Sequence, residues 1–122
     1  MLSWFSIFKK TEKKSVQYQA PEVTFLYEQD GPPERLLKEK LTEMFSQNET
    51  VERAYLAMAR LGSESGVVLG LATRSGPDEK IVTNVQAAFA SECHTNEHLD
   101  IVFLTTNLEA QLTKVCRPFF AV

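Results

Sequence analysis

The residues with the most obvious chemical potential in this 122-residue chain gather in one stretch, ECHTNEHLD. Within it, His94, Glu97 and His98 spell H-x-x-E-H, the pattern of the inverted zinc proteases, in which two histidines bind zinc and a glutamate acts on the attacking water. Cys93 and Asp100 flank the motif, and thiolates, imidazoles and carboxylates are all zinc ligands. The stretch therefore raises the hypothesis of a small zinc-dependent hydrolase.

The surroundings of the motif favour a loop. A zinc protease presents its two histidines from one face of a helix, but here a helical pattern ends near Glu92 and an apolar strand pattern begins near Leu99. Thr95 and Asn96 are weak helix formers, and zinc needs a third protein ligand. We therefore expect a solvated connection, and neither a metal nor another cofactor. The alternative is a metal site within the loop, with four candidate ligands: Cys93, His94, His98 and Asp100.

Charge and composition argue against several classes of function and location. The net charge is −3, and residues 1–14 carry four lysines against Glu12, or +3, which leaves −6 for the rest of the chain. An acidic body argues against general nucleic-acid binding, where a basic surface supplies most of the affinity. Two cysteines make no disulfide framework, and the sequence shows neither a secretory signal nor an apolar run long enough to span a membrane. We expect a cytoplasmic protein.

The first 20 residues read as a leader before a single domain that covers residues 21–122. The leader begins with large apolar side chains and continues with lysines. Such a segment packs on its own domain, docks on a partner such as a second copy, stays mobile, or contacts an anionic membrane surface through residues 1–14. The membrane contact is the weaker interpretation, because so short a segment buries little apolar area. Its candidate binding residues are Trp4, Phe5 and Phe8.

Hydrophobic periodicity predicts alternating strands and helices. The expected strands cover residues 22–28, 51–61, 67–73 and 99–106, with a further short strand at 119–122. We expect the strand at 51–61 to be buried on both faces along its middle, and a helix is the alternative there because Ala, Leu and Met favour helices. The expected helices cover residues 34–48, 79–92 and 108–115, the last with Asn107 as its cap. The first two helices each carry an apolar stripe, at Leu37, Leu41, Met44 and Phe45 and at Ile81, Val82, Val85, Ala88 and Phe89. Gly70, inside an expected strand, predicts a bulge or the close approach of another element. Three arginines of the central hairpin are candidate anion ligands, with solvated strand ends as the alternative: Arg53, Arg60 and Arg74.

This order predicts an α+β fold. The first six elements, β-α-β-β-α-β, are those of a ferredoxin-like unit. We therefore expect an antiparallel four-stranded sheet with two helices packed on one face and an additional C-terminal helix. The other face of such a sheet is then free for a partner or a small molecule.

Several of these segments resemble a known family. Four segments carry this resemblance: the V-x-x-A-Y-L strand at Val51–Leu56, the aliphatic strand around Gly70, the strand that begins with an aspartate at Asp100–Leu104, and the closing Pro118–Phe120. Over roughly residues 22–120 the chain resembles the C-terminal domain of the SseB (enhanced serine sensitivity protein B) family. It departs in having Phe120 where the family closes on tyrosine, and in having the basic leader where an N-terminal domain often stands.

The resemblance implies a bacterial, cytoplasmic setting and a link to serine metabolism, but no catalytic residues. Together with the sequence it leads us to expect a non-enzymatic binding or adaptor module. We expect a protein partner or self-association into an oligomer, no nucleic acid, and a small-molecule ligand that the sequence does not name. The zinc-dependent hydrolase is the alternative.

Overall fold

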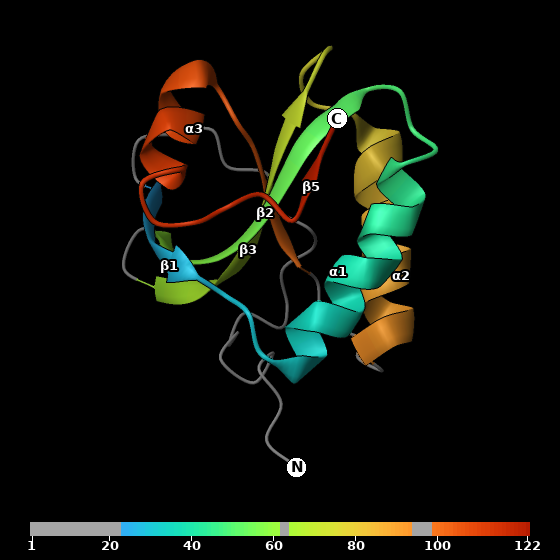
Figure 1. Ribbon diagram of the computed structural model, residues 1–122, viewed down its shortest axis with the longest axis horizontal. Coiled ribbons are helices and arrows are strands. Elements are labelled where there is room, and N and C mark those ends of the chain that lie inside the picture. Colours follow the sequence, from blue (N-terminus) through green and yellow to red (C-terminus); the bar gives the residue numbers. More distant parts are fainter. Residues whose placement is uncertain (1–22, 62–63, 94–98) are drawn as a thin grey trace.

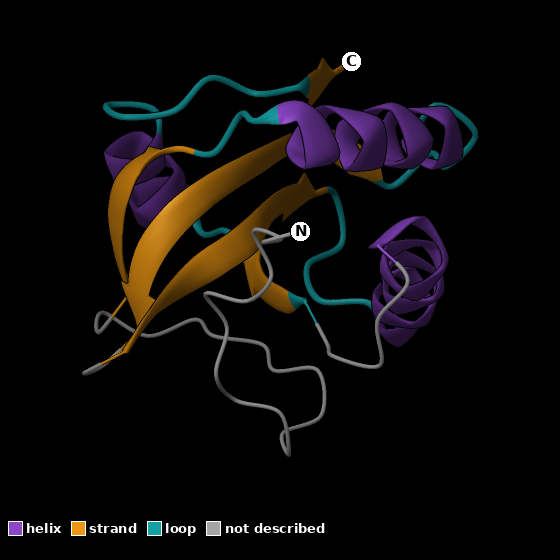
Figure 2. Ribbon diagram, turned by 90° about the horizontal axis from the view of Figure 1, so that it is seen from below, coloured by secondary structure: helices purple, strands orange, loops and turns teal. Residues whose placement is uncertain are grey.

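The computed structural model describes residues 23–61, 64–93 and 99–122, and their fold is α+β (Figures 1 and 2). The strands are β1 (Val23–Glu28), β2 (Val51–Leu61), β3 (Glu64–Thr73), β4 (Asp100–Phe103) and β5 (Phe120–Ala121). The helices are α1 (Pro32–Phe45), α2 (Glu79–Cys93) and α3 (Thr106–Leu112). None of the helices in this part of the chain is long and apolar enough to cross a membrane.

The five strands form one mixed sheet. Strands β1 to β4 follow each other in chain order, with β1, β2 and β3 antiparallel and β4 parallel to β3. Helix α2 supplies the crossover that a parallel pair requires. Strand β5 pairs with β2 at Arg53 and Ala54, while β1 pairs with β2 from Ala57 to Leu61. Both therefore share one edge of β2, and β3 occupies the other.

This pairing corrects two expectations. The sheet is not wholly antiparallel, and its order is not that of a ferredoxin-like sheet, in which the first strand lies in the centre. The physical reason is that, among the strands that the structure describes, β1 pairs with β2 alone, while β4 adds to the outer edge of β3. Periodicity predicts which residues form a strand, but does not predict which edge a later strand joins.

Helices cover both faces of the sheet, where the sequence predicted two helices on one face. Helices α1 and α2 pack on one face, and α3 packs on the other (Figure 1). The first core contains the predicted apolar stripes of α1 and α2: Leu37, Leu41, Phe45, Ile81, Val85 and Phe89. The second contains Leu108 and Leu112 of α3. The face that was expected to be free is therefore partly covered by α3.

Strand β2 alternates between these two cores. Ala54, Leu56 and Met58 belong to the core under α1 and α2, while Tyr55 and Ala57 belong to the core under α3. All five are buried. This confirms that the strand is buried on both faces along its middle, which explains why its sequence is apolar at consecutive positions.

Local signals determine where the helices begin. At α1 the backbone N–H of Gly31 donates to Glu34 Oε1 at 2.9 Å, and the Gln29 side chain donates to the other carboxylate oxygen at 3.0 Å. Glu34 is thereby buried with both oxygens bonded. At α3 the Thr105 hydroxyl accepts from the N–H of Leu108 at 3.1 Å, so Thr105 is the cap where the sequence suggested Asn107.

Gly70 of β3 lies against α3. A Cβ atom on Gly70 would lie 3.0 Å from Leu112 Cδ2 and 3.4 Å from Leu104 Cδ1. Leu112 is buried, so its side chain has little room to move away. The predicted close approach of another element to this glycine is confirmed, and the absence of a side chain is what allows α3 to lie against β3.

We predict that Gly70→Val destabilises the protein by about 1–3 kcal/mol, because the added methyl groups overpack the contact between β3 and α3. Urea unfolding monitored by circular dichroism measures this change. The penalty should shrink in a Leu112→Ala background, where the crowding atoms are gone. An equal penalty in both backgrounds would show that the α3 contact is not its cause.

Candidate functional site

The elements that bound the histidine motif lie close to where the sequence predicts them. Helix α2 ends at Cys93 and β4 begins at Asp100, while His94 and His98 lie outside the described residues. The Gln86 side chain joins the two elements, because it accepts from the N–H of Leu99 at 2.9 Å and donates to its carbonyl oxygen at 2.6 Å. A side chain in the middle of α2 thus fixes the position of Leu99, the residue that precedes β4.

The structure describes two of the four candidate metal ligands, Cys93 and Asp100. Burial, and then the carboxylates of Glu92 and Glu34, raise the pKa of the Cys93 thiol to about 11, whereas nucleophilic attack requires the thiolate. Asp100 is buried at the start of β4. Among the residues that the structure describes, no three histidine, cysteine or acidic side chains cluster as metal ligands. These observations give no support to a zinc hydrolase.

A polar cluster links β2 to α3. The guanidinium of Arg53 donates to both carboxylate oxygens of Glu109, at 2.9 Å for the bond to Oε1, and the Tyr55 hydroxyl donates to Oε2 at 2.6 Å. Arg53 and Tyr55 both come from β2, and Glu109 lies in the first turn of α3. The carboxylate therefore receives three hydrogen bonds from two side chains that are 56 and 54 residues away.

The protonation states of this cluster reinforce each other. The hydrogen bond from Arg53 lowers the pKa of Glu109, and the bond from Tyr55 lowers it further. Burial, followed by the bond to Glu109, raises the pKa of Tyr55 to about 12. The glutamate is therefore ionised and the tyrosine protonated at neutral pH. Because the groups satisfy one another, the cluster is suited to holding α3 on the sheet.

The three arginines predicted as anion ligands do not meet at one point, although two of them share a carboxylate. Arg53 binds Glu109 and lies 4.0 Å from Glu52 Oε1, and Arg74, directly after β3, lies 3.7 Å from Glu52 Oε2. Arg60 is exposed near the far end of β2, seven positions from Arg53 and hence roughly 23 Å away along an extended strand. The structure thus pairs two of the arginines with carboxylates and separates the third from both.

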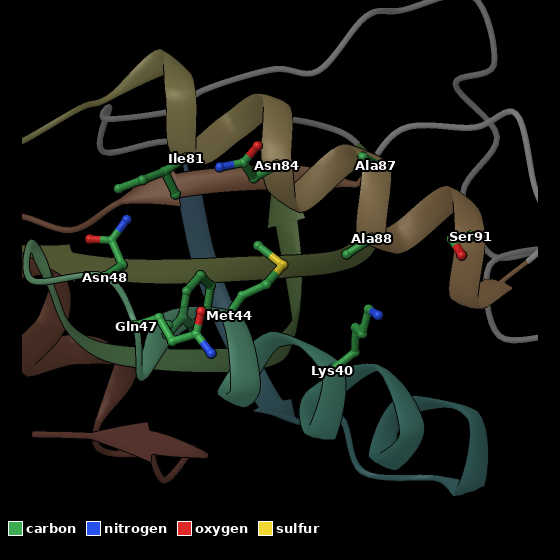
Figure 3. Close-up of a pocket in the computed structure, with 10 residues that line it drawn as sticks. Lys40, Met44, Gln47, Asn48, Ile81, Asn84, Ala87, Ala88 and Ser91 are labelled. Carbon is green, nitrogen blue, oxygen red and sulfur yellow. The ribbon is translucent and has the colours of Figure 1, made fainter.

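One hollow lies between α1 and α2 (Figure 3). This α1–α2 groove has a volume of about 540 Å³. Its apolar lining comes from both helices: Met44, Phe45, Ile81, Ala87 and Ala88. Its polar lining consists of Lys40, Gln47, Asn48, Asn84 and Ser91. Asn48 and Ile81 mark one end of the groove and Lys40 and Ser91 the other.

An acidic hollow of about 550 Å³ adjoins the groove and shares Lys40 with it. Its charged walls are Glu39 and Glu43 of α1 and Glu92 of α2, and the exposed side chain of Leu36 lies among them. Within the described part of the chain, none of these three carboxylates forms an ion pair with a basic side chain. The groove is therefore bordered by an excess of negative charge, three carboxylates against Lys40.

A third hollow, of about 620 Å³, lies between the connection from α1 to β2 and the C-terminal strand. Its walls are mainly residues 46–51 and 120–122, together with Arg74. The Phe120 ring packs edge-on against Phe45, with centroids 5.7 Å apart. This hollow depends on a loop and a two-residue strand, whereas the α1–α2 groove is built on two long helices, which hold a site more precisely.

Sequence reasoning did not find the groove. Its signal was present in α2, where short side chains recur at i, i+3, i+4 and i+7: Asn84, Ala87, Ala88 and Ser91. Short side chains along one helix flank leave the space beside a neighbouring helix incompletely filled. Of the predicted binding residues, Trp4, Phe5 and Phe8 lie outside the described residues.

The fold is that of a small α+β domain, and the groove lies on its surface between helices α1 and α2. A comparison with family models matches residues 21–121 to the SseB protein C-terminal domain. The chain belongs to this family, as its sequence resemblance indicated. Neither the comparison with curated proteins nor that with solved structures gives a significant match.

We predict that Glu109→Gln lowers the free energy of unfolding at pH 7 by about 1–3 kcal/mol and that Tyr55→Phe lowers it by about 1 kcal/mol, because each loses hydrogen bonds at the β2–α3 link. Denaturant unfolding measures both values. Glu79→Gln, an exposed change on α2, is the matched control and should be nearly neutral.

The effect of Glu109→Gln should depend on pH. Because the folded protein lowers the pKa of Glu109 below its ordinary value of 4.5, the stabilisation is complete above that value and is lost as the pH falls through the lower folded pKa. The wild-type and Glu109→Gln stabilities should therefore converge in acid. A stability difference that stays constant as the pH falls below 4.5 would contradict this assignment.

Proposed function

We propose that the chain is a non-enzymatic binding module that takes a short segment of a protein partner in the α1–α2 groove. The observation that carries the proposal is the groove itself, which is lined by apolar side chains from both helices together with polar ones. A peptide that lays apolar side chains into a groove between helices is a common mode of protein recognition. The proposal is consistent with the SseB resemblance, which assigns no catalytic residue to this chain.

The lining chemistry supports binding over catalysis. Acid–base and nucleophilic catalysis require paired titratable groups within hydrogen-bond reach of each other. Lys40 is the one titratable side chain among the described residues that line the groove. The strongest polar cluster, made by Arg53, Tyr55 and Glu109, satisfies its own hydrogen bonds. This distribution favours recognition by shape and apolar contact.

The size of the groove supports weak, reversible association. One aromatic side chain buries about 150–250 Å², worth roughly 4–6 kcal/mol at about 25 cal/mol per Å². The loss of translational and rotational freedom on binding opposes much of this gain. Hydrogen bonds from Gln47, Asn48, Asn84 or Ser91 to the partner's backbone would add specificity. We therefore expect a transient partner, recognised by an apolar anchor.

The link to serine metabolism implied by the SseB resemblance remains a prediction about the biological setting. Growth of a deletion strain on serine-containing medium tests it. Complementation by the intact gene, but not by one altered in the groove, would connect that setting to the proposed binding surface.

We predict that Ala87→Arg removes partner binding while Ala110→Arg does not. Both alanines are exposed on helices, and arginine is a good helix former, so both variants should remain folded. The first places a long side chain in the groove and the second places the same side chain on α3. Crosslinking in cells followed by mass spectrometry should identify partners of the wild type and of Ala110→Arg that are lost with Ala87→Arg. Recovery of the same partners with all three proteins would refute the groove as the binding surface.

A further inference from the structure

We propose that the basic, aromatic leader, residues 1–14, is the chain's own ligand for the α1–α2 groove. The inference deepens the proposed function and rests on it, because it names a segment that occupies the same surface. The leader would then compete with an external partner for the groove. Binding of the partner would require the leader to leave.

Charge complementarity is the first support. The leader carries +3, from Lys9, Lys10, Lys13 and Lys14 against Glu12, while the remainder of the chain carries −6. The acidic hollow beside the groove presents Glu39, Glu43 and Glu92 against Lys40 alone. A segment with apolar residues in the groove can therefore set its lysines against these carboxylates, and the attraction should weaken as salt is added.

The order of residues in the leader provides the second support. Its large apolar side chains come first, at positions 2, 4, 5, 7 and 8, and its lysines follow. The surface has the same order, since the apolar groove adjoins the acidic hollow at Lys40. The groove volume of about 540 Å³ falls within the roughly 300–1,000 Å³ typical of ligand sites. An aromatic anchor such as Trp4 or Phe5 suits a space of this kind.

Chain length permits the leader to reach its own groove. Fourteen residues separate Phe8 from the start of β1 at Val23, and a chain of that length spans at most about 46–50 Å. A domain of about 100 residues has a radius of gyration near 13 Å. A tethered segment also has an effective concentration in the millimolar range. Occupation by the same chain is therefore favoured over occupation by a second copy.

The test uses Trp4, the only tryptophan in the chain, as a reporter in the full-length protein. Its emission maximum and its quenching by acrylamide are measured for the wild type, Ala87→Arg and the control Ala110→Arg. A synthetic peptide of residues 1–14 gives the values for a free leader. We expect blue-shifted, protected Trp4 in the wild type and in Ala110→Arg, and values close to those of the peptide in Ala87→Arg.

Three further measurements complete the test. The double variant Glu39→Lys with Glu43→Lys should also release Trp4, and added salt should release it in the wild type. Wild-type emission should not change on dilution, since the leader binds within one chain. Trp4 as exposed in the wild type as in the peptide, Trp4 equally protected in Ala87→Arg, or protection lost on dilution would each overturn the inference.

Failure of this inference is distinguishable from failure of the proposed function. If Trp4 is insensitive to Ala87→Arg while crosslinked partners still depend on Ala87, the leader proposal is wrong and the groove remains a binding surface. If the crosslinked partners are unaffected by Ala87→Arg, the proposed function itself is wrong.

Discussion

The architecture depends on the burial of β2 on both faces. Its consecutive apolar residues cannot be left in water on either side, so the sheet needs cover from both directions. Helices α1 and α2 cover one face and α3 covers the other. The same strand is paired along both edges, by β3 on one and by β1 with β5 on the other. The remaining elements take their positions from this strand.

The short α3 has little apolar surface of its own, and polar contacts add to its attachment. Leu108 and Leu112 supply its buried side chains, and Gly70 lets it approach the sheet closely. The hydrogen bonds that Arg53 and Tyr55 donate to Glu109 add a charge-assisted link from β2 to α3. These groups are engaged with each other, and the groove between the two long helices lies on the opposite face of the sheet.

The sequence predicted what local pattern controls and missed what depends on neighbours. The α1 stripe and the close approach at Gly70 followed from side-chain spacing and from a missing Cβ. The mixed sheet did not, because periodicity carries no information on strand neighbours. The Arg53–Glu109 pair joins residues 56 positions apart, beyond any local signal. The groove was missed because Ala87 and Ala88 satisfy the amphipathic pattern of a core helix, which hides the unfilled space beside α1.

The central claim is that the α1–α2 groove is an occupied binding surface, and Met44 is its most direct probe. Met44 lines the groove, whereas Met58 is buried in β2 and serves as an internal reference. Methyl-labelled NMR spectra of the full-length chain should show contacts between the Met44 methyl group and aromatic protons of residues 4–8. Ala87→Arg should abolish these contacts and leave Met58 unchanged. A Met44 methyl group without such contacts, and with a resonance that is the same with and without residues 1–14, would contradict the account.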